Sequence, residues 1–448
     1  MKKNLLLFVI LAFFLSVSCE KIDQPPVTEN LAIKLNDQVS SGHLKMAVVS
    51  DPHYLHSSLL INGGENGAAF KNDLAKNPNK ALMAYSAPIF KSVFVDLMDE
   101  KPQILLIPGD LAKDGEYVSH IQMASYLKML QDNGTKVYVV PGNNDILNKD
   151  AVAYNGDYST PVQNIVPGQF SSIYNDFGYG SAISRDDSSL SYVAQPVEGL
   201  WILAIDACRY QPTVSRSGRI RFGTMMWITQ QLNKAREKKV TVIGMMHHNL
   251  IEHIQNQNAV TPQTVIDNWQ VIADQLVDKG LEVIFTGHSH ANDISQRASG
   301  GKVLYDIATG STIAFPSQYR MIILKNKEMD IRTSYVTDIS EPMPGDMSFT
   351  DYGNKQQADL FNTFFTNYFK MPVFNMSDST IKAAAPLAGN AYMAFFAGDE
   401  NISPLEQARL DAFYMVNPLP TAFIGAANSL WTDLGVKDNK WHIKLIEK

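Results

Sequence analysis

The stretch IFTGHSH, residues 284–290, places two histidines one residue apart directly after a run of apolar residues. The run 282–286 is typical of a buried strand, and Gly287 allows the chain to turn where that strand ends. With one residue between them, His288 and His290 can project from the same turn. A pair of this kind indicates a ligand site, because ligands of α/β proteins gather at the carboxyl ends of strands.

Other apolar runs have the same strand-like character, and most of them also end in polar side chains. Since strand ends of an α/β sheet face one crevice, we expect these side chains to lie close to His288 and His290. The runs cover 46–50, 104–108, 136–140, 200–205 and 240–246, and the side chains that follow them are Asp51, His53, Asp110, Asn143, His247 and His248.

Segments with apolar residues at helical spacing lie between these runs, at 84–98, 118–130, 224–235 and 265–277. Strands that alternate with helices predict an α/β layered domain. The later runs 302–308, 319–324 and 329–336 have no helical segment between them. We therefore expect these three to be consecutive antiparallel strands.

Composition restricts the class of protein. The chain has 448 residues, of which 45% are hydrophobic and 19% are charged, which suits one large domain plus a smaller one. The net charge of −7 gives no support to nucleic-acid binding, which would require a basic face.

The amino terminus has the features of an export signal. Lys2 and Lys3 precede a short apolar run, and small residues lead to Cys19. Residues 1–18 resemble a bacterial lipoprotein signal peptide, which predicts a lipidated Cys19, a tether over 19–42 and anchoring in the cell envelope, on the periplasmic or the cell-surface face. The alternative is an ordinary cleaved signal with an incidental cysteine. With Cys19 lipidated, Cys208 would be alone and could form no internal disulfide.

The sequence changes character near residue 340. We expect a main domain over 43–340 and a mostly helical extension over 341–448 that packs on it. Ser403, Pro404 and Glu406 form a typical helix start, with Ser403 as the N-cap. A second helical segment covers 354–370, and we expect its aromatic stripe to be packed core rather than a ligand site; the stripe is Phe361, Phe364, Phe365 and Tyr368.

The polar residues at the strand ends form a ligand set for two divalent ions. Asp51, His53 and His290 can hold one ion, and Asn143, His247 and His288 can hold the other. Asp110 can bridge both, because a carboxylate has enough lone pairs. Two carboxylates, two dications and a bridging hydroxide leave about one positive charge, which suits a phosphate ester as substrate. Mixed nitrogen and oxygen ligands favour zinc, manganese or iron.

These motifs together resemble the calcineurin-like metallophosphoesterase superfamily over residues 43–340. The resemblance implies a four-layer α-β-β-α sandwich with two mixed β-sheets, to which the helical extension would be added. It implies a dinuclear metal centre that hydrolyses phosphomonoesters or phosphodiesters with a bridging hydroxide as nucleophile. The metal ligands that match are Asp51, His53, Asp110, Asn143, His247, His288 and His290, with His247 preferred to its neighbour His248.

The sequence departs from this family at Asn144. The resemblance implies a histidine there, which contacts the substrate and protonates the leaving oxygen, oriented by the acid that is here Asp145. Asn144 can donate a hydrogen bond but cannot give up a proton. Another histidine could replace it, or the substrates could have acidic leaving groups; the candidate histidines are His56, His120, His248 and His253. The third reading is a ligand-binding lipoprotein on a catalytically impaired scaffold.

Three further segments could contribute to the site. The polar segment 54–80 could be a lid or a disordered excursion, and 252–262 could form the opposite wall of the site. One of the arginines between strand and helix could bind phosphate, although such arginines more often face solvent; they are Arg209, Arg216, Arg219 and Arg221.

Overall fold

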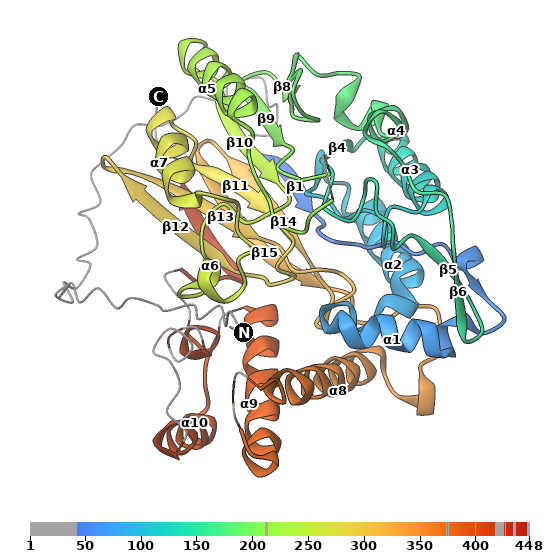
Figure 1. Cartoon of the computed structure of the whole chain (residues 1–448). Helices are drawn as coiled ribbons and strands as arrows, with labels where there is room; N and C mark the ends of the chain where they lie inside the picture. Colours follow the sequence, from blue (N-terminus) through green and yellow to red (C-terminus); the bar gives the residue numbers. More distant parts are fainter. Residues whose placement is uncertain are drawn as a thin grey trace, which may run out of the picture. The chain divides into compact units, whose positions relative to one another are not determined.

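The computed structural model of this chain describes residues 43–210, 214–372, 374, 376–398, 400–416, 425, 427–432 and 436–445 (Figure 1). The description below concerns these residues alone. The predicted signal peptide 1–18 and the tether 19–42, with Cys19, lie outside the described residues.

One mixed sheet has six strands, and its centre is the first strand of the domain, β1 (Leu44–Val48). β1 is parallel to β3 on one side and antiparallel to β14 on the other. The strand order is β16 (Lys440–Lys444), β15 (Glu328–Tyr335), β14 (Gln318–Lys325), β1, β3 (Ile104–Ile107) and β4 (Lys136–Val139).

The second mixed sheet has seven strands, and its centre is a parallel set formed by β9, β10, β11 and β13. Its strand order is β12 (Ile294–Ser299), β13 (Lys302–Ala308), β11 (Val283–Thr286), β10 (Thr241–Met246), β9 (Leu200–Ile205), β8 (Tyr192–Val197) and β7 (Ser184–Arg185). A small third sheet contains β2 (Leu60–Ile61), β5 (Val152–Asn155) and β6 (Tyr158–Pro161).

Alternation of side chains along β9 shows how the layers are stacked. Ile202 and Ala204 belong to the core that also contains β1 and β3, whereas Leu203 and Ile205 pack with the outer helices. These outer helices are α5 (Phe222–Glu237) and α7 (Trp269–Lys279), and α2 (Ser86–Glu100) and α3 (Tyr117–Asp132) pack with the six-stranded sheet. The predicted four-layer α-β-β-α sandwich with two mixed sheets is therefore confirmed.

The helical run Pro78–Glu100, which contains α2, is long and apolar enough to cross a membrane by length and composition. Phe90, Val93 and Leu97 of this run are fully buried in the protein core. We therefore assign it as a core helix of the sandwich.

One prediction about the strands is wrong. β14 and β15 are antiparallel neighbours, as expected, but β13 does not pair with β14. β13 lies between β11 and β12 in the seven-stranded sheet, and residues 309–317 cross to the six-stranded sheet. The apolar pattern of a strand identifies the strand and its faces but carries no information about which of two stacked sheets it joins.

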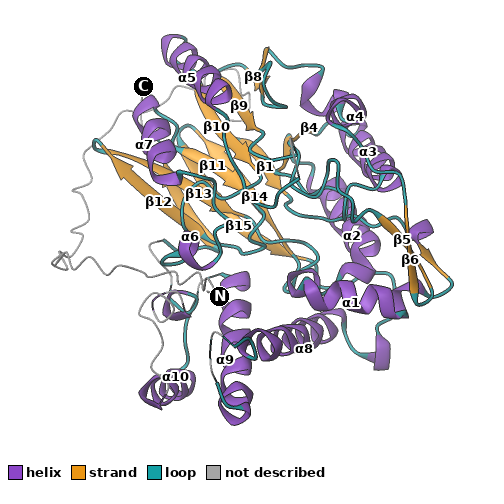
Figure 2. Ribbon diagram, in the orientation of Figure 1, coloured by secondary structure: helices purple, strands orange, loops and turns teal. Residues whose placement is uncertain are grey.

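The carboxyl-terminal region packs on the domain through α8 (Phe349–Phe369) and α9 (Asp378–Ala397), and α10 (Pro404–Val416) packs on α9 (Figure 2). Phe361 and Phe365 are core residues, as predicted, and share a cluster with Ile254 and Ala291 of the sandwich. Phe364 and Tyr368 of the same stripe are only partly buried and line a cavity, so the prediction of packed core holds for half of the stripe. The Ser403 hydroxyl accepts from the Glu406 amide at 3.2 Å, which confirms the predicted helix start. The sequence did not predict β16, which joins β15 at the sheet edge.

Shorter helices cover the remaining segments. The predicted polar segment 54–80 is ordered and contains α1 (Ala68–Lys76), and the segment after β10 contains α6 (Gln257–Val260). α4 covers Pro167–Ile173.

Candidate metal centre

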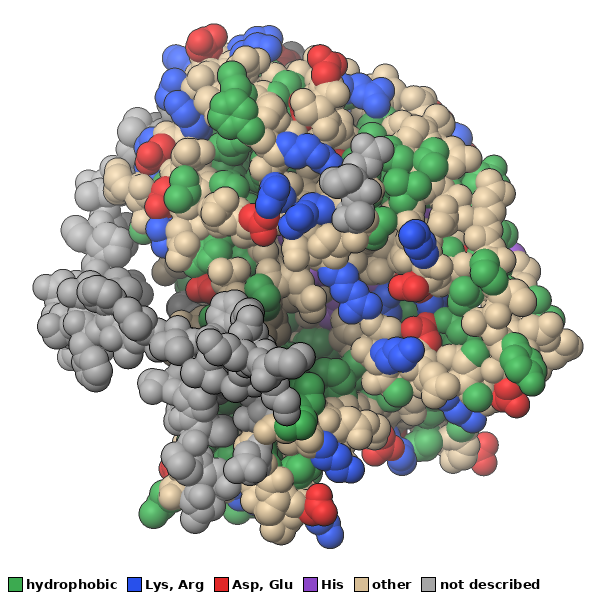
Figure 3. Space-filling model, viewed as in Figure 1, with side chains coloured by type: hydrophobic (Ala, Val, Ile, Leu, Met, Phe, Trp, Pro, Cys, Tyr) green, Lys and Arg blue, Asp and Glu red, His purple; other side chains and the backbone are tan. Residues whose placement is uncertain are grey.

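The predicted ligand residues form two groups whose ligand atoms lie within 4.8 Å of one another: Asp51, His53 and His290 in the first, and Asp110, His247 and His288 in the second. They follow strands β1, β3, β10 and β11, and Asn143 follows β4. Figure 3 shows histidine atoms in a hollow of the molecule, with Lys and Arg side chains near its rim.

In the first group, backbone carbonyls determine which ring nitrogen faces the site. His53 Nδ1 lies 3.4 Å from the Lys113 carbonyl, and His290 Nδ1 lies 2.9 Å from the Asn79 carbonyl. Because a carbonyl oxygen only accepts, each Nδ1 carries the hydrogen and each Nε2 offers a lone pair. The two Nε2 atoms are 3.2 Å apart, and two lone pairs at this distance repel each other unless a cation lies between or beside them.

Asp51 completes the first group, and one of its two carboxylate oxygens is available to bind a metal ion. Its Oδ2 accepts from the His288 amide at 3.0 Å and from Ser50 Oγ at 2.5 Å. Its Oδ1 is buried, has no hydrogen-bond partner among the described residues and lies 3.5 Å from His290 Nε2. A buried carboxylate oxygen without a donor is costly unless a cation satisfies it, so this oxygen fits a metal ligand.

The second group is built in the same manner. His247 Nδ1 donates to the Pro108 carbonyl at 2.8 Å, so its Nε2 faces Asn143 Oδ1 at 3.0 Å. His288 is the exception in orientation, because its Nε2 donates to the Gln263 carbonyl at 3.0 Å. Its Nδ1 therefore offers the lone pair, 3.1 Å from His247 Nε2. These converging acceptors also fit a divalent transition metal ion.

Asp110 lies between the two groups. Its Oδ2 is 3.5 Å from His53 Nε2 and 3.4 Å from His247 Nε2. Burial opposes the ionised form, but the charges of His247 and His53 hold the pKa of Asp110 well below its usual range. Burial likewise opposes protonation of His247, yet Asp110 raises the pKa of His247 to about 9. The negative charge of Asp110 therefore favours a cation beside it, and its position between the two groups allows it to contact both ions.

The ligand loops require unusual backbone. Five of the ligand residues have positive φ angles: Asp51 at 47°, His53 at 40°, Asp110 at 51°, His288 at 65° and His290 at 59°. Residues other than glycine rarely adopt this conformation, and such strain is concentrated at functional sites. The neighbouring Gly142 packs directly on Asp110, where a Cβ atom would lie 2.1 Å from Asp110 Oδ1.

Asn144 and Asp145 have different surroundings. Asn144 donates to both carboxylate oxygens of Asp110, from its backbone amide at 2.8 Å and from Nδ2 at 2.6 Å. Asp145 is buried and accepts from the amides of Gly142 at 2.8 Å and Ala112 at 3.0 Å. Asn144 therefore faces the metal ligands, and Asp145 holds the loop beneath them. A catalytic part for either residue stays a prediction.

The His248 ring packs against the His288 ring in a tilted arrangement, with centroids 4.4 Å apart and an interplanar angle of 44°. Its Nε2 donates to the Arg216 carbonyl at 2.8 Å, and burial, with the charge of His247, lowers its pKa to about 3. A neutral ring whose hydrogen is already engaged has no proton for a leaving group. This geometry favours a positioning role for His248, and its catalytic part stays a prediction.

The other candidate histidines lie outside this crevice. His120 is buried between the Tyr174 hydroxyl and the Asp145 carbonyl. His253 is buried between Asp293 and Asp306. His56 contacts Ser58 at 2.8 Å in an exposed turn.

Arg216 connects the two sides of the metal centre. Its carbonyl accepts from His248 on the side of the second group, and its Nη2 donates to Asn77 Oδ1 at 3.2 Å. Asn77 precedes Asn79, the carbonyl partner of His290 in the first group, by two residues. By contrast, Arg209 and Arg219 both pair with Asp267. Arg221 Nη1 lies 3.8 Å from the buried Asp206. Arg216 is thus the one of the four without a carboxylate partner among the described residues, and phosphate binding by it stays a prediction.

Sequence reasoning missed a buried charged cluster behind the first group. Lys113 pairs with Asp73 at 2.9 Å and with Asp114, and Lys80 Nζ lies 3.8 Å from Asp114. After the effect of burial, the charge of Lys80 is the next cause that lowers the pKa of His53. The segment GDLAKDGE was a visible signal for Lys113 and Asp114, whereas nothing in the sequence near Lys80 marked it.

Comparison with solved structures finds similarity at low identity. A dimetal phosphatase from Danio rerio is 14% identical with a TM-score of 0.45, covering 65% of this chain and 96% of that one. GAP50, the anchor in the inner membrane complex of Plasmodium, is 12% identical with a TM-score of 0.33, covering 72% and 96%. PhoD is 10% identical with a TM-score of 0.38, covering 67% of each chain.

No curated protein matches this chain. The family model for calcineurin-like phosphoesterases matches residues 44–292, more than half of the sequence, and this span contains all seven predicted ligands. The chain therefore belongs to the calcineurin-like phosphoesterase family.

Proposed function

We propose that this protein is a phosphoric ester hydrolase that acts on phosphomonoesters or phosphodiesters with two divalent transition metal ions, zinc, manganese or iron. The observation that carries the proposal is the convergence of lone pairs described above, with Asp51 Oδ1 unsatisfied and Asp110 between the two groups. Family membership supports metal-dependent hydrolysis of phosphate esters.

When bound, the two ions would supply an ionised water as nucleophile and positive charge for the phosphoryl oxygens. The chain positions them: Asp51, His53 and His290 would hold one, Asn143, His247 and His288 the other, and Asp110 both. The carbonyl partners of the histidines fix the ring orientations, which keeps the lone pairs directed into the crevice.

Of the steps of the reaction, the residues of this chain contribute least to the departure of the leaving group. Asn144 can stabilise a developing charge through its Nδ2 hydrogens, but it cannot transfer a proton. His248 is neutral with its hydrogen engaged, and the other candidate histidines lie elsewhere. The chemistry therefore favours esters with acidic leaving groups, which depart without protonation.

Arg216 would contribute to binding of the substrate. Its guanidinium is exposed, so it can exchange its hydrogen bond to Asn77 for one to a phosphate oxygen.

The proposal includes the cellular location, a lipid anchor at Cys19 in the bacterial cell envelope. This part rests on the amino-terminal sequence alone. A second candidate function is a cell-surface ligand-binding lipoprotein on a catalytically impaired scaffold. Asn144 favours it, because this residue replaces the proton donor that the family resemblance implies.

The test uses protein from residue 20 onward, loaded with manganese, zinc or iron. We expect up to two ions per chain by elemental analysis and hydrolysis of bis-p-nitrophenyl phosphate. Asp110→Asn should abolish both turnover and full metal loading, whereas Asp274→Asn, at a half-buried ion pair with Arg297, should change neither. Two bound ions without turnover of any mono- or diester would favour the ligand-binding alternative, and failure to bind metal would refute the metal centre.

A further inference from the structure

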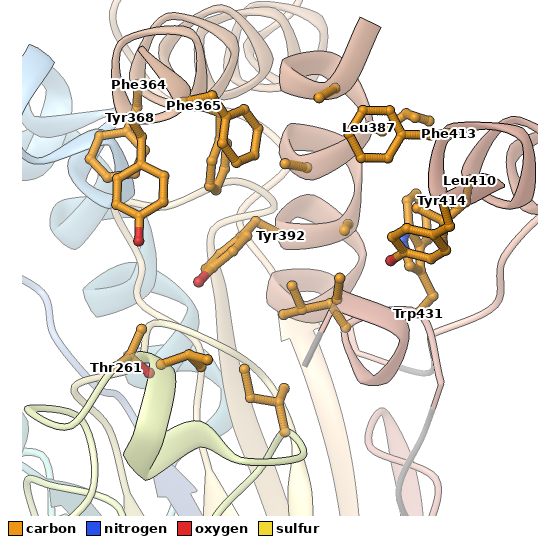
Figure 4. Close-up of a pocket in the computed structure, with 18 of the residues that line it drawn as sticks. Thr261, Phe364, Phe365, Tyr368, Leu387, Tyr392, Leu410, Phe413, Tyr414 and Trp431 are labelled. Atoms are coloured by element: carbon orange, nitrogen blue, oxygen red, sulfur yellow. The ribbon is translucent and has the colours of Figure 1, made fainter. Parts of the chain in front are cut away.

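A cavity of about 390 Å³ lies between the carboxyl-terminal helices and the segment that follows β10. Figure 4 shows aromatic side chains of α8 and α9 on one side, with Thr261 of the segment below them. Phe364, Tyr368 and Tyr392 are only partly buried, so their rings form open walls rather than closed core. The volume is within the range of small-molecule sites, about 300 to 1,000 Å³.

The cavity is lined by hydrocarbon. Aromatic rings and aliphatic side chains make up nearly all of the described lining, Thr261 and Gln263 are its polar members besides tyrosine hydroxyls, and none of them is charged. A phosphate group would lose its hydration there without gaining a cation or a donor array, so it is excluded. A hydrocarbon group would gain burial and dispersion contacts with the rings.

The cavity and the metal centre are connected through Gln263 and through α9. Gln263 lines the cavity, and its carbonyl accepts from Nε2 of the ligand His288 at 3.0 Å. On the other side, Phe396 of α9 packs on the ring of the ligand His290, with centroids 6.4 Å apart. Gln263 thus joins the lining of the cavity directly to a ligand residue of the second group. Phe396 lies outside the lining, four residues after Tyr392, and connects α9 to a ligand residue of the first group.

We propose that this cavity is the subsite for a hydrocarbon group of the substrate, an alkyl chain or aryl ring esterified to the phosphate that binds at the metal centre. The proposal rests on the proposed function and names its substrate class: amphiphilic phosphate esters. The assignment rests on the difference in polarity between two neighbouring regions. The metal centre with Arg216 is polar and cationic, whereas the adjoining cavity is apolar and uncharged. A molecule with a phosphate at one end and a hydrocarbon at the other matches both.

The experiment measures kcat/KM for 4-nitrophenyl phosphodiesters whose second group is ethyl, butyl or octyl. Each methylene that enters an apolar site contributes on the order of fourfold. Because burial of the chain is partial, we expect at least about a tenfold rise from ethyl to octyl. Equal values across the series would overturn the subsite.

Two variants locate the effect. Ala388→Trp would fill the cavity from α9, and Leu387→Asn would make its wall polar without added bulk. Both should bring the ratio of octyl to ethyl kcat/KM close to one. Ala383→Trp is the matched control, since Ala383 is exposed on the same helix and outside the cavity lining, and it should keep the wild-type ratio. Variants that keep the full chain-length effect would overturn the assignment.

A binding measurement separates this inference from the proposed function. If no ester is hydrolysed by the metal-loaded protein, the proposed function fails, and calorimetry with decyl phosphate and ethyl phosphate still tests the cavity. Tighter binding of decyl phosphate that is lost in Ala388→Trp would support the subsite. Equal binding of the two phosphates, or binding that Ala388→Trp leaves unchanged, would overturn it.

Discussion

Gly142→Ala should disable the metal centre although the change adds a single methyl group outside the ligand set. A Cβ atom at this position would lie 2.1 Å from Asp110 Oδ1 and 2.2 Å from the Asp110 amide nitrogen. Gly142 is not among the residues with positive φ, so the alanine backbone itself is unstrained and the effect is steric. Either Asp110, which lies between the two ligand groups, or the loop that contains Gly142 must therefore move.

The size of the effect follows from the contact distance. An ordinary van der Waals contact begins at 3.4 Å, so Asp110 must retreat by more than 1 Å. Metal–carboxylate bonds of about 2.0 to 2.2 Å tolerate deviations of about 0.2 Å. A displacement several times larger should release at least one ion, and kcat/KM should fall by about 100-fold or more. Overpacking of this kind costs about 1 to 3 kcal/mol, which leaves a typical domain folded.

The assay combines elemental analysis, hydrolysis of bis-p-nitrophenyl phosphate and thermal unfolding. Gly168→Ala is the matched control, because a Cβ atom there meets nothing within 4 Å, and it should bind metal and turn over as the wild type does. If Gly142→Ala retains two ions and the wild-type kcat/KM, the inferred packing of Gly142 on a metal-bridging Asp110 is refuted. Loss of the folded state would instead appear as a lowered unfolding midpoint before any metal measurement.

Three more predictions concern single side chains. Asn144→His should raise kcat on esters with poor leaving groups by up to about 10² to 10⁴-fold and change nitrophenyl esters much less, as steady-state kinetics would reveal; equal gains would exclude a missing general acid. Arg216→Ala should raise KM for phosphate esters about tenfold with a smaller change in kcat, whereas Arg219→Ala, whose partner is Asp267, should leave KM unchanged. Burial lowers the pKa of His253, but Asp293 and Asp306 raise it to about 10, so its stabilising effect is fully present below about pH 6.5 and is lost as the pH rises through about 10. Between pH 7 and 9.5 the free energy of unfolding should fall by up to about 3 kcal/mol more in the wild type than in His253→Gln, measured with denaturant.

Much of the sandwich can be predicted from sequence because its strands are continuously apolar. β9 begins and ends where the apolar run does, since burial on both faces leaves no polar residue inside the strand. β13 also matches its run, although the buried Asp306 interrupts the apolar pattern. The sheet that contains β13 could not be predicted, because residues 309–317 give no direction for the crossing. β16 was missed for a related reason: Lys440–Lys444 alternates at a sheet edge and is too polar to resemble a core strand.

The residues of the candidate centre could be named from sequence because each follows a strand end, but their conformations could not. Nothing in the letters indicates that Asp51 or His53 has a left-handed backbone, which is normally a property of glycine. This conformation depends on contacts from distant segments, such as the hydrogen bond from the His53 amide to the Asp110 carbonyl at 2.9 Å. The strain is held by the fold as a whole, so local propensity cannot reveal it.

The orientation of the imidazole rings is the property of the site that the sequence predicts least well. Sequence treats His288 and His290 as equivalent members of one motif. In the structure His290 offers Nε2 because Asn79 holds its Nδ1, and His288 offers Nδ1 because Gln263 holds its Nε2. Since Gln263 also lines the apolar cavity, a substrate group that shifts its segment would act directly on the hydrogen bond that orients His288. The same contact that fixes a metal ligand thus gives the cavity a physical route to the metal centre.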